Sequence, residues 1–205
     1  MTAALWTAKL ERPLTEGEEA VLLAALPPER RKRLPRRRTQ WREPLCAYGL
    51  LRAALRERYG WQELPAMSLT ARGKPYFQDF PQVQFSLSHT DGAVLVGLSD
   101  QPVGVDIERI RPPGPHLLRR LGEDLSPEAF FQIWVRREAR AKCGGEGVSA
   151  LLRPEPPLEP GEVYCPVETF PGYAAGAAVR GTDLPGSPRA LSLEELLRAG
   201  APPAL

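Results

Sequence analysis

Two carboxylates stand one residue apart in the stretch Val103–Glu108, which reads Val-Gly-Val-Asp-Ile-Glu. Its three apolar residues alternate with Gly104, Asp106 and Glu108, and this period predicts a half-buried strand. Asp106 and Glu108 would then share one face of that strand, about 7 Å apart. Because neighbouring acids repel, a hard divalent cation with oxygen ligands, above all Mg²⁺, would explain the pair. An ordinary solvated strand face is the simpler alternative, so other residues must decide between the two.

A third acid, Glu138, lies on a predicted helix over residues 126–143. Ser126 is a suitable N-cap, Pro127 suits the first helical position, and Gly144-Gly145 ends the pattern. Trp134, Glu138 and Lys142 recur every four residues and therefore share one face. A surface ion pair between Glu138 and Lys142 is the alternative and would be worth only about 0.2–0.5 kcal/mol. The apolar residues beside the pair favour a more buried position.

A histidine and a second lysine precede these acids. The alternating stretch 83–88 predicts a strand that ends in Ser88 and His89, and Asp91-Gly92 predicts a hairpin to a strand at 93–98. Consecutive hairpins would bring His89 and both acids to one end of a single sheet, although a lone histidine is more often structural. Gly73-Lys74-Pro75 predicts a bend that exposes its lysine.

The charge of the chain is unevenly distributed. Residues 30–42 contain eight basic side chains and no acid, whereas the whole chain has a net charge of only +2, so the remainder carries −6. A basic segment on an otherwise acidic protein indicates an anionic ligand, either phosphates or nucleic acid. The segment has no stacking aromatic besides Trp41, and nucleic-acid binding would leave the acidic residues unexplained. We therefore expect phosphates and no nucleic acid.

Length and composition set the broad class. The chain has 205 residues, 42% of them hydrophobic and 25% charged, which is typical of a globular protein. Three cysteines without ligand spacing and two histidines argue against zinc, and free thiols suit the cytoplasm. We expect neither a targeting sequence nor a membrane segment. Further helices are predicted at 15–26, at 40–59 and after Ser192, and further strands at 162–169 and 173–180.

Several ordered motifs resemble the surfactin-type 4′-phosphopantetheinyl transferases. They are Arg-Pro-Leu at 12–14, the basic segment, Gly73-Lys74-Pro75, Phe85-Ser-Leu-Ser-His89, Gly104-Val-Asp-Ile-Glu108, Trp134-x-x-Arg-Glu138-x-x-x-Lys142, Pro171-Gly-Tyr173 and Leu191-Ser-Leu-Glu-Glu-Leu-Leu197. Together they extend over nearly the whole chain in the family's order. Ser86 stands where the family commonly has Asn, Arg137 replaces a Lys, and Glu43 occupies the expected place of an arginine.

The resemblance implies an α+β protein with two similar halves, 1–102 and 103–205, in a pseudo-twofold arrangement around coenzyme A. It implies transfer of 4′-phosphopantetheine from coenzyme A to a serine of an apo acyl or peptidyl carrier protein, with release of adenosine 3′,5′-bisphosphate. We expect a cytoplasmic monomer without membrane attachment.

The resemblance also assigns residues. Asp106, Glu108 and Glu138 would hold Mg²⁺, and Ser88, His89 and Lys142 would contact the phosphates of coenzyme A. Lys74 would lie by the nucleotide, and the 3′-phosphate would bind Arg30, Arg33 and Arg42. Glu138 is our candidate for the base that activates the serine, directly or through water, and Lys142 would stabilise the leaving phosphate. A homologue that binds coenzyme A but has lost catalysis is the main alternative.

Overall fold

The structure is a computed structural model that describes residues 3–114, 118, 125–146, 155–181 and 185–200. Along the chain, the elements are β1 (Ala4–Lys9), α1 (Glu16–Ala25), α2 (Pro28–Arg31), the 3₁₀ turn η1 (Arg38–Gln40), α3 (Arg42–Tyr59), β2 (Met67–Leu69), β3 (Pro75–Phe77), β4 (Gln84–Thr90), β5 (Ala93–Ser99), β6 (Val103–Arg109), α5 (Pro127–Gly144), β7 (Glu162–Pro166), β8 (Tyr173–Arg180), β9 (Arg189–Leu191) and α6 (Leu193–Gly200).

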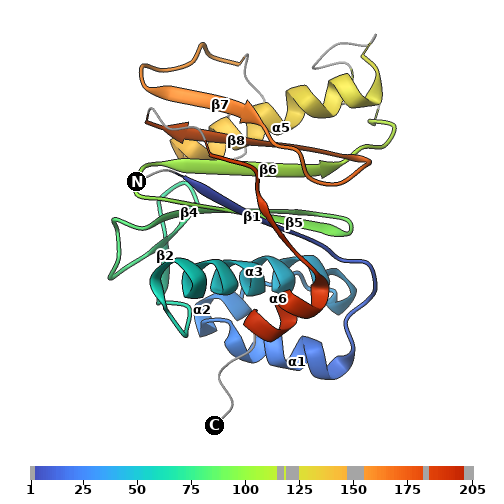
Figure 1. The fold of residues 1–205 in the computed structure, drawn as a ribbon, viewed down its shortest axis with the longest axis vertical. Coiled ribbons are helices and arrows are strands. Elements are labelled where there is room, and N and C mark those ends of the chain that lie inside the picture. Colours follow the sequence, from blue (N-terminus) through green and yellow to red (C-terminus); the bar gives the residue numbers. More distant parts are fainter. Residues whose placement is uncertain (1–2, 115–117, 119–124, 147–154, 182–184, 201–205) are drawn as a thin grey trace.

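The elements form layers. In Figure 1, α1, α3 and α6 lie on the outer side of a sheet that contains β1, β4 and β5, and a second sheet with α5 lies beyond it. The first sheet has the order β4-β5-β1-β9, the second has the order β6-β8-β7, and β2 and β3 form a small hairpin. This mixed architecture is compatible with the expected α+β class. The pseudo-twofold relation between the halves and their boundary after residue 102 stay predictions.

The predicted helices are present, and their ends follow from local sequence. Thr15 and Glu18 form a reciprocal capping box at the start of α1. Ser126 Oγ accepts a hydrogen bond from the Ala129 amide at 3.2 Å at the start of α5. Gly145 ends α5 with a left-handed φ of 68°. Among the described helices, none is both long and apolar enough to cross a membrane.

The prediction of one sheet containing His89 and both acids is wrong. Strand β4 pairs with β5, but β6 leaves this sheet and pairs antiparallel with β8, which comes much later in the chain. The apolar side chains of β6 pack into a core shared with the first sheet, and this core includes Leu5, Ala93 and Leu95. Strands β4 and β6 nevertheless lie next to each other, so the candidate residues still meet at the junction of the two sheets.

Helix α5 approaches β6 unusually closely, and Gly104 permits this approach. A Cβ atom at position 104 would lie 2.0 Å from the carbonyl oxygen of Ala139 and 2.3 Å from the amide nitrogen of Cys143. On the same strand, Val105 and Ile107 are fully buried. The missing side chain therefore sets the distance between the strand that carries Asp106 and the helix that carries Glu138 and Lys142.

Candidate active site

The centre of the site is a buried contact between β6 and α5. Lys142 Nζ lies 2.6 Å from Asp106 Oδ1 and 3.5 Å from Glu138 Oε2. Ser88 Oγ, on β4, donates a hydrogen bond to the same Asp106 oxygen at 2.7 Å. Asp106 is only 2% exposed, so the solvated strand face proposed as the simpler alternative does not describe this residue. One strand from each sheet and the helix thus contribute to a single polar cluster.

The electrostatics of the cluster follow from burial and from its close charges. Burial raises the pKa of Glu138 to about 7, the negative charge of Asp106 adds to the effect, and Lys142 opposes it. Burial alone would lower the pKa of Lys142, but its attraction to Asp106 and Glu138 outweighs burial, so this pKa is raised. Lys142 therefore stays charged at neutral pH, while Glu138 titrates near neutrality and is suited to accept a proton.

Glu108 occupies the outer end of the cluster. Its Oε2 accepts a hydrogen bond from Thr90 Oγ1 at 3.0 Å and lies 3.4 Å from the guanidinium of Arg111. Burial raises the pKa of Glu108, and the neighbouring charge of Asp106 raises it further. Mutual repulsion of the acids is thus present in the structure, as the sequence pattern predicts.

The chemistry of these acids fits a hard cation. Asp106 Oδ2 is buried and has no hydrogen-bond partner in the described part of the chain, so an oxygen lone pair is available. Lys142 supplies positive charge between Asp106 and Glu138. Within the described ranges, however, no three His, Cys, Asp or Glu side chains are already grouped closely enough to hold a metal ion. The three carboxylates would have to converge further around Mg²⁺, and the magnesium site stays a prediction.

A cavity of about 470 Å³ opens beside this cluster. Its described lining contains five basic residues and one acid, Glu138, a net formal charge of +4; the basic residues are Arg30, Arg33, Arg72, Lys74 and Lys142. Arg30 is held by a 2.6 Å hydrogen bond from its Nε to the hydroxyl of Tyr48. The cavity therefore suits a ligand that carries several negative charges.

His89 lies where this cavity meets a second, more open groove of about 710 Å³. Desolvation by the surrounding residues and the positive charge of Lys142 lower the pKa of His89, although the residue is exposed and lines both spaces. The described groove lining has two arginines and three acids, a net formal charge of −1, and includes Leu14, Pro35 and Pro44. The two spaces thus differ strongly in charge on either side of His89.

Lys74 is less exposed than the bend at Gly73-Lys74-Pro75 predicts. Its Nζ donates to the carbonyl oxygens of Val103 at 3.0 Å and Cys143 at 3.5 Å, and burial lowers its pKa. The side chain therefore ties the β2–β3 hairpin to the first residue of β6 and the last turn of α5. Its stem still lines the basic cavity, so a position near a nucleotide stays a prediction.

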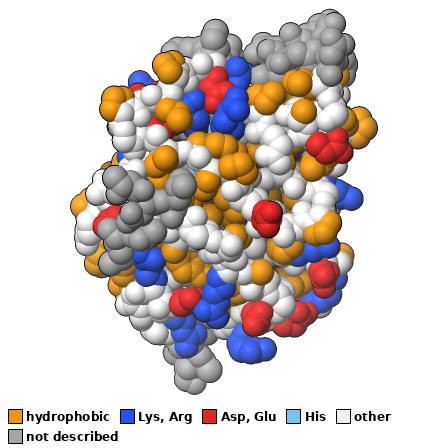
Figure 2. Space-filling model, turned by 45° about the horizontal axis from the view of Figure 1, so that its top comes forward, with side chains coloured by type: hydrophobic (Ala, Val, Ile, Leu, Met, Phe, Trp, Pro, Cys, Tyr) orange, Lys and Arg blue, Asp and Glu red, His pale blue; other side chains and the backbone are white. Residues whose placement is uncertain are grey.

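The basic segment 30–42 does not form one surface. Arg30 and Arg33 line the cavity, but Arg42 lines the neighbouring groove, where it pairs with Glu43 at 2.6 Å. Arg31 donates to the carbonyl oxygens of Leu26 and Ala24. On the face drawn in Figure 2, basic and acidic side chains lie beside one another. The predicted shared contact of Arg30, Arg33 and Arg42 with one phosphate is therefore not preformed.

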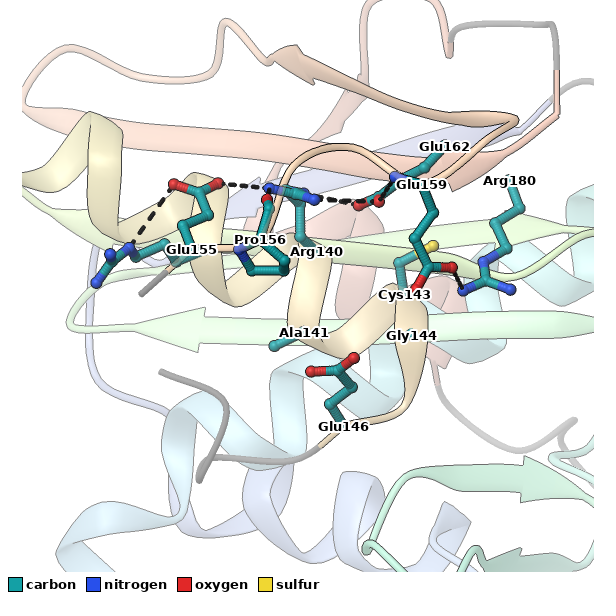
Figure 3. Close-up of a pocket in the computed structure, with 11 residues that line it drawn as sticks. Arg140, Ala141, Cys143, Gly144, Glu146, Glu155, Pro156, Glu159, Glu162 and Arg180 are labelled. Carbon is teal, nitrogen blue, oxygen red and sulfur yellow. Dashed lines mark hydrogen bonds and ion pairs between the residues drawn. The ribbon is translucent and has the colours of Figure 1, made fainter. Parts of the chain in front are cut away.

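A much smaller cavity, about 50 Å³, lies on the other side of α5 (Figure 3). Most of its charges are already paired: Arg140 contacts Glu155 at 2.9 Å and Glu162 at 2.7 Å, and Arg180 pairs with Glu159. These ion pairs attach the segment from Glu155 to β7 onto α5. The cavity thus belongs to the framework that holds the helix in place.

Two contributors to the site were missed in the sequence. The first is the close approach at Gly104, whose signal was a glycine within a predicted strand. The second is Thr90, whose signal was the alternation of hydroxyl residues Ser86, Ser88 and Thr90 along one strand. These three hydroxyl residues lie on the buried face of β4, where polar groups need hydrogen-bond partners on a neighbouring element.

The chain is similar to proteins named 4′-phosphopantetheinyl transferase. It is 34% identical to AcpT of Escherichia coli strain K12 over 147 aligned positions, which cover 63% of this chain and 71% of AcpT. It is 24% identical to Sfp of Bacillus subtilis strain 168 over 217 aligned positions, 92% of this chain and 97% of Sfp. A further Bacillus subtilis protein of this name is 26% identical over 158 positions, 70% of each chain. No protein-family model matches the chain.

These likenesses define the class of protein as an enzyme that transfers phosphopantetheine. The chain belongs to the 4′-phosphopantetheinyl transferase family, and the resemblance to its surfactin-type members is confirmed.

Proposed function

We propose that this enzyme transfers 4′-phosphopantetheine from coenzyme A to a serine of an apo acyl or peptidyl carrier protein. The reaction would use Mg²⁺ and release adenosine 3′,5′-bisphosphate. The observation that carries the proposal is the juxtaposition of the +4 cavity with the buried Asp106–Lys142–Glu138 cluster. A cavity for several phosphates beside a group that can accept a proton is what transfer from a pyrophosphate requires.

The difference in charge between the two spaces suggests how coenzyme A lies. The adenosine bisphosphate part carries the negative charges and suits the cavity of Arg30, Arg33 and Lys74. The uncharged pantetheine arm suits the groove beyond His89, whose net formal charge is −1. The pyrophosphate would then lie between them, at His89 and Lys142, next to the carboxylates.

The residues supply the chemistry as follows. The serine oxygen forms a bond to the phosphorus that carries pantetheine, and the bond from this phosphorus to the bridging oxygen breaks. Glu138 accepts the serine proton, a role worth about 10²–10⁴-fold in rate. Lys142 and neutral His89 interact with the phosphate oxygens on which negative charge develops. When bound by Asp106, Glu108 and Glu138, Mg²⁺ would neutralise charge on the pyrophosphate.

The compartment and oligomeric state complete the proposal: a cytoplasmic monomer whose partners are coenzyme A and the carrier protein. The free cysteines Cys46, Cys143 and Cys165 support a reducing compartment. Sedimentation equilibrium should give a mass of 22.6 kDa for the monomer.

The proposed function is tested by mass spectrometry of candidate apo carrier proteins incubated with enzyme, coenzyme A and Mg²⁺. We expect the carrier to gain the mass of phosphopantetheine, and a carrier whose acceptor serine is replaced by alanine should gain nothing. An active transferase serves as the positive control. If the protein binds coenzyme A but no carrier gains mass, the result supports a homologue that has lost catalysis. Full transfer in excess chelator would contradict the role of Mg²⁺.

A further inference from the structure

Three hydroxyls on β4 contact three backbone amides on β6. Ser86, Ser88 and Thr90 accept hydrogen bonds from the amides of Val105, Ile107 and Arg109, at 3.0, 3.2 and 3.3 Å respectively. We call this set of contacts the hydroxyl seam. It takes the place of a backbone ladder between the two strands and joins the two sheets.

The hydroxyl seam follows from the position of β6 at the edge of its sheet. One side of β6 pairs with β8, so the amides that point the other way need acceptors from β4. A carbonyl could fill this need, but a hydroxyl oxygen that accepts also carries one hydrogen that it can donate. Each hydroxyl of the seam can therefore bind a second group while it satisfies the strand.

Two of the three hydroxyls donate to the candidate metal ligands. Ser88 Oγ donates to Asp106 Oδ1 at 2.7 Å, and Thr90 Oγ1 donates to Glu108 Oε2 at 3.0 Å. The period of both strands is two residues, so the pattern repeats in register. At the third position the register brings Ser86 to Gly104, which has no side chain to receive a hydrogen bond.

Thr90 competes with Arg111 for the same oxygen of Glu108. Thr90 is 9% exposed, whereas the Arg111 side chain is 56% exposed and lies 3.4 Å from Glu108 Oε2. The arginine is also held over the ring of Phe131, 5.2 Å from its centroid. Without the hydroxyl, the guanidinium would draw the carboxylate outward, away from Asp106.

We propose that Thr90 is a positioning residue that orients the Glu108 carboxylate toward the candidate metal site. The inference rests on the proposed function, in which the Glu108 carboxylate held by Thr90 binds Mg²⁺. Thr90 acts on the site through Glu108. Its hydroxyl also accepts a hydrogen bond from the Arg109 amide, which is a purely structural role. The test must separate these two roles.

The test compares Thr90→Val, which keeps the shape but removes the hydroxyl, with Thr90→Ser and Ser86→Ala. Binding of Mn²⁺ alone is measured by calorimetry without coenzyme A, and unfolding by denaturant is measured for each protein. We expect Thr90→Val to bind Mn²⁺ about tenfold more weakly, the size typical of a lost outer hydrogen bond to a metal ligand. Thr90→Ser should restore the affinity, and Thr90→Val combined with Arg111→Met should recover part of it.

Ser86→Ala is the matched control, since it removes a hydroxyl from the same seam at the place that faces Gly104. We expect it to lose stability as Thr90→Val does while its Mn²⁺ affinity stays that of the wild type. Unchanged affinity in Thr90→Val, or an equal loss in Ser86→Ala, would overturn the positioning role. A different result would contradict the metal site of the proposed function itself: the wild type would bind no Mn²⁺, or would bind it no better than Asp106→Asn does.

Discussion

Lys142 Nζ lies 2.6 Å from Asp106 Oδ1, so helix α5 and strand β6 meet in an ion pair whose carboxylate is buried. Ser88 contacts the same carboxylate oxygen and brings β4 of the first sheet into the contact. The pair therefore has a structural task as well as a place in the proposed chemistry.

The first prediction concerns Asp106→Asn. It should abolish transfer and also lower the free energy of unfolding by about 3 kcal/mol, because it leaves the Lys142 charge without its main partner. The strand pattern alone suggests that a change here spares the fold, but the burial of Asp106 contradicts this. Denaturant unfolding measures the effect, and Asp106→Asn with Lys142→Met should regain stability without activity. Unchanged unfolding of the single variant would contradict the prediction.

Gly104→Ala tests the close approach of α5 and β6. The added Cβ would lie 2.0 Å from a backbone oxygen, so the helix or strand must move, at a cost of about 1–3 kcal/mol. Displacement of Glu138 and Lys142 should lower kcat by about 100-fold. Gly17→Ala is the control, since its Cβ would meet no atom within 4 Å. Wild-type kcat in Gly104→Ala would show that the spacing is not critical.

Arg33→Met tests recognition of the 3′-phosphate. If Arg33 contacts this group, the loss should be about 1.5–3 kcal/mol, tenfold or more in affinity for coenzyme A. Binding of 3′-dephospho-coenzyme A should change little in the same calorimetric titration. Arg36→Met removes an equal charge from the same segment at an exposed position outside the cavity, and should leave both affinities unchanged. Equal losses for both ligands in Arg33→Met would assign Arg33 to another role.

Glu138→Gln separates a base from a metal ligand. As a base, Glu138 accounts for about 10²–10⁴-fold in rate, so kcat should fall by this amount with little change in coenzyme A affinity. Steady-state kinetics over a range of Mg²⁺ concentrations measures both effects. We expect excess Mg²⁺ to leave most of the loss in place. Recovery of the full rate at high Mg²⁺ would show that the proton goes elsewhere.

His89 provides a test of the electrostatics by pH titration. The chain has two histidines, so a His116→Gln background isolates the His89 signal in an NMR titration. We expect a midpoint below the ordinary value of 6.5, because desolvation by the surrounding residues and the charge of Lys142 disfavour the charged ring. Just below pH 6.5 the unfolded chain then binds more protons at His89 than the folded protein does. The free energy of unfolding therefore decreases as the pH falls through that window. A midpoint above 6.5 in the free enzyme would contradict this account.

The sequence pattern was sufficient for elements whose signals are local. The helices α3 and α5, the hairpin β4–β5 and strand β6 agree with their predicted positions, because periodicity, caps and turn residues lie within each segment. Strand β1 was missed. Leu5, Trp6, Thr7 and Ala8 are all buried, so a strand covered on both faces shows no alternation of apolar and polar residues.

The candidate site could be predicted as a set of residues but not as an arrangement. Asp106, Glu138, Lys142 and Ser88 meet, although the pairing of β6 with β8 that separates the sheets depends on distant parts of the chain. For the same reason, the bend at Lys74 gave no sign that its ammonium contacts the carbonyls of Val103 and Cys143. Local patterns specify which side chains are polar, and distant packing decides which carbonyl or carboxylate they reach.

The path of the chain after β8 has a consequence for how the protein can be divided. Strand β9 returns to pair in parallel with β1, and Leu193 and Leu196 of α6 are buried in the core beside α3. A fragment that stops at residue 102 would therefore expose both an unpaired edge of β1 and an apolar face of the helical layer. Cutting the gene after residue 102 should yield insoluble pieces, whereas the two fragments expressed together should reassemble, because β9 and α6 restore the pairing of β1 and the packing beside α3.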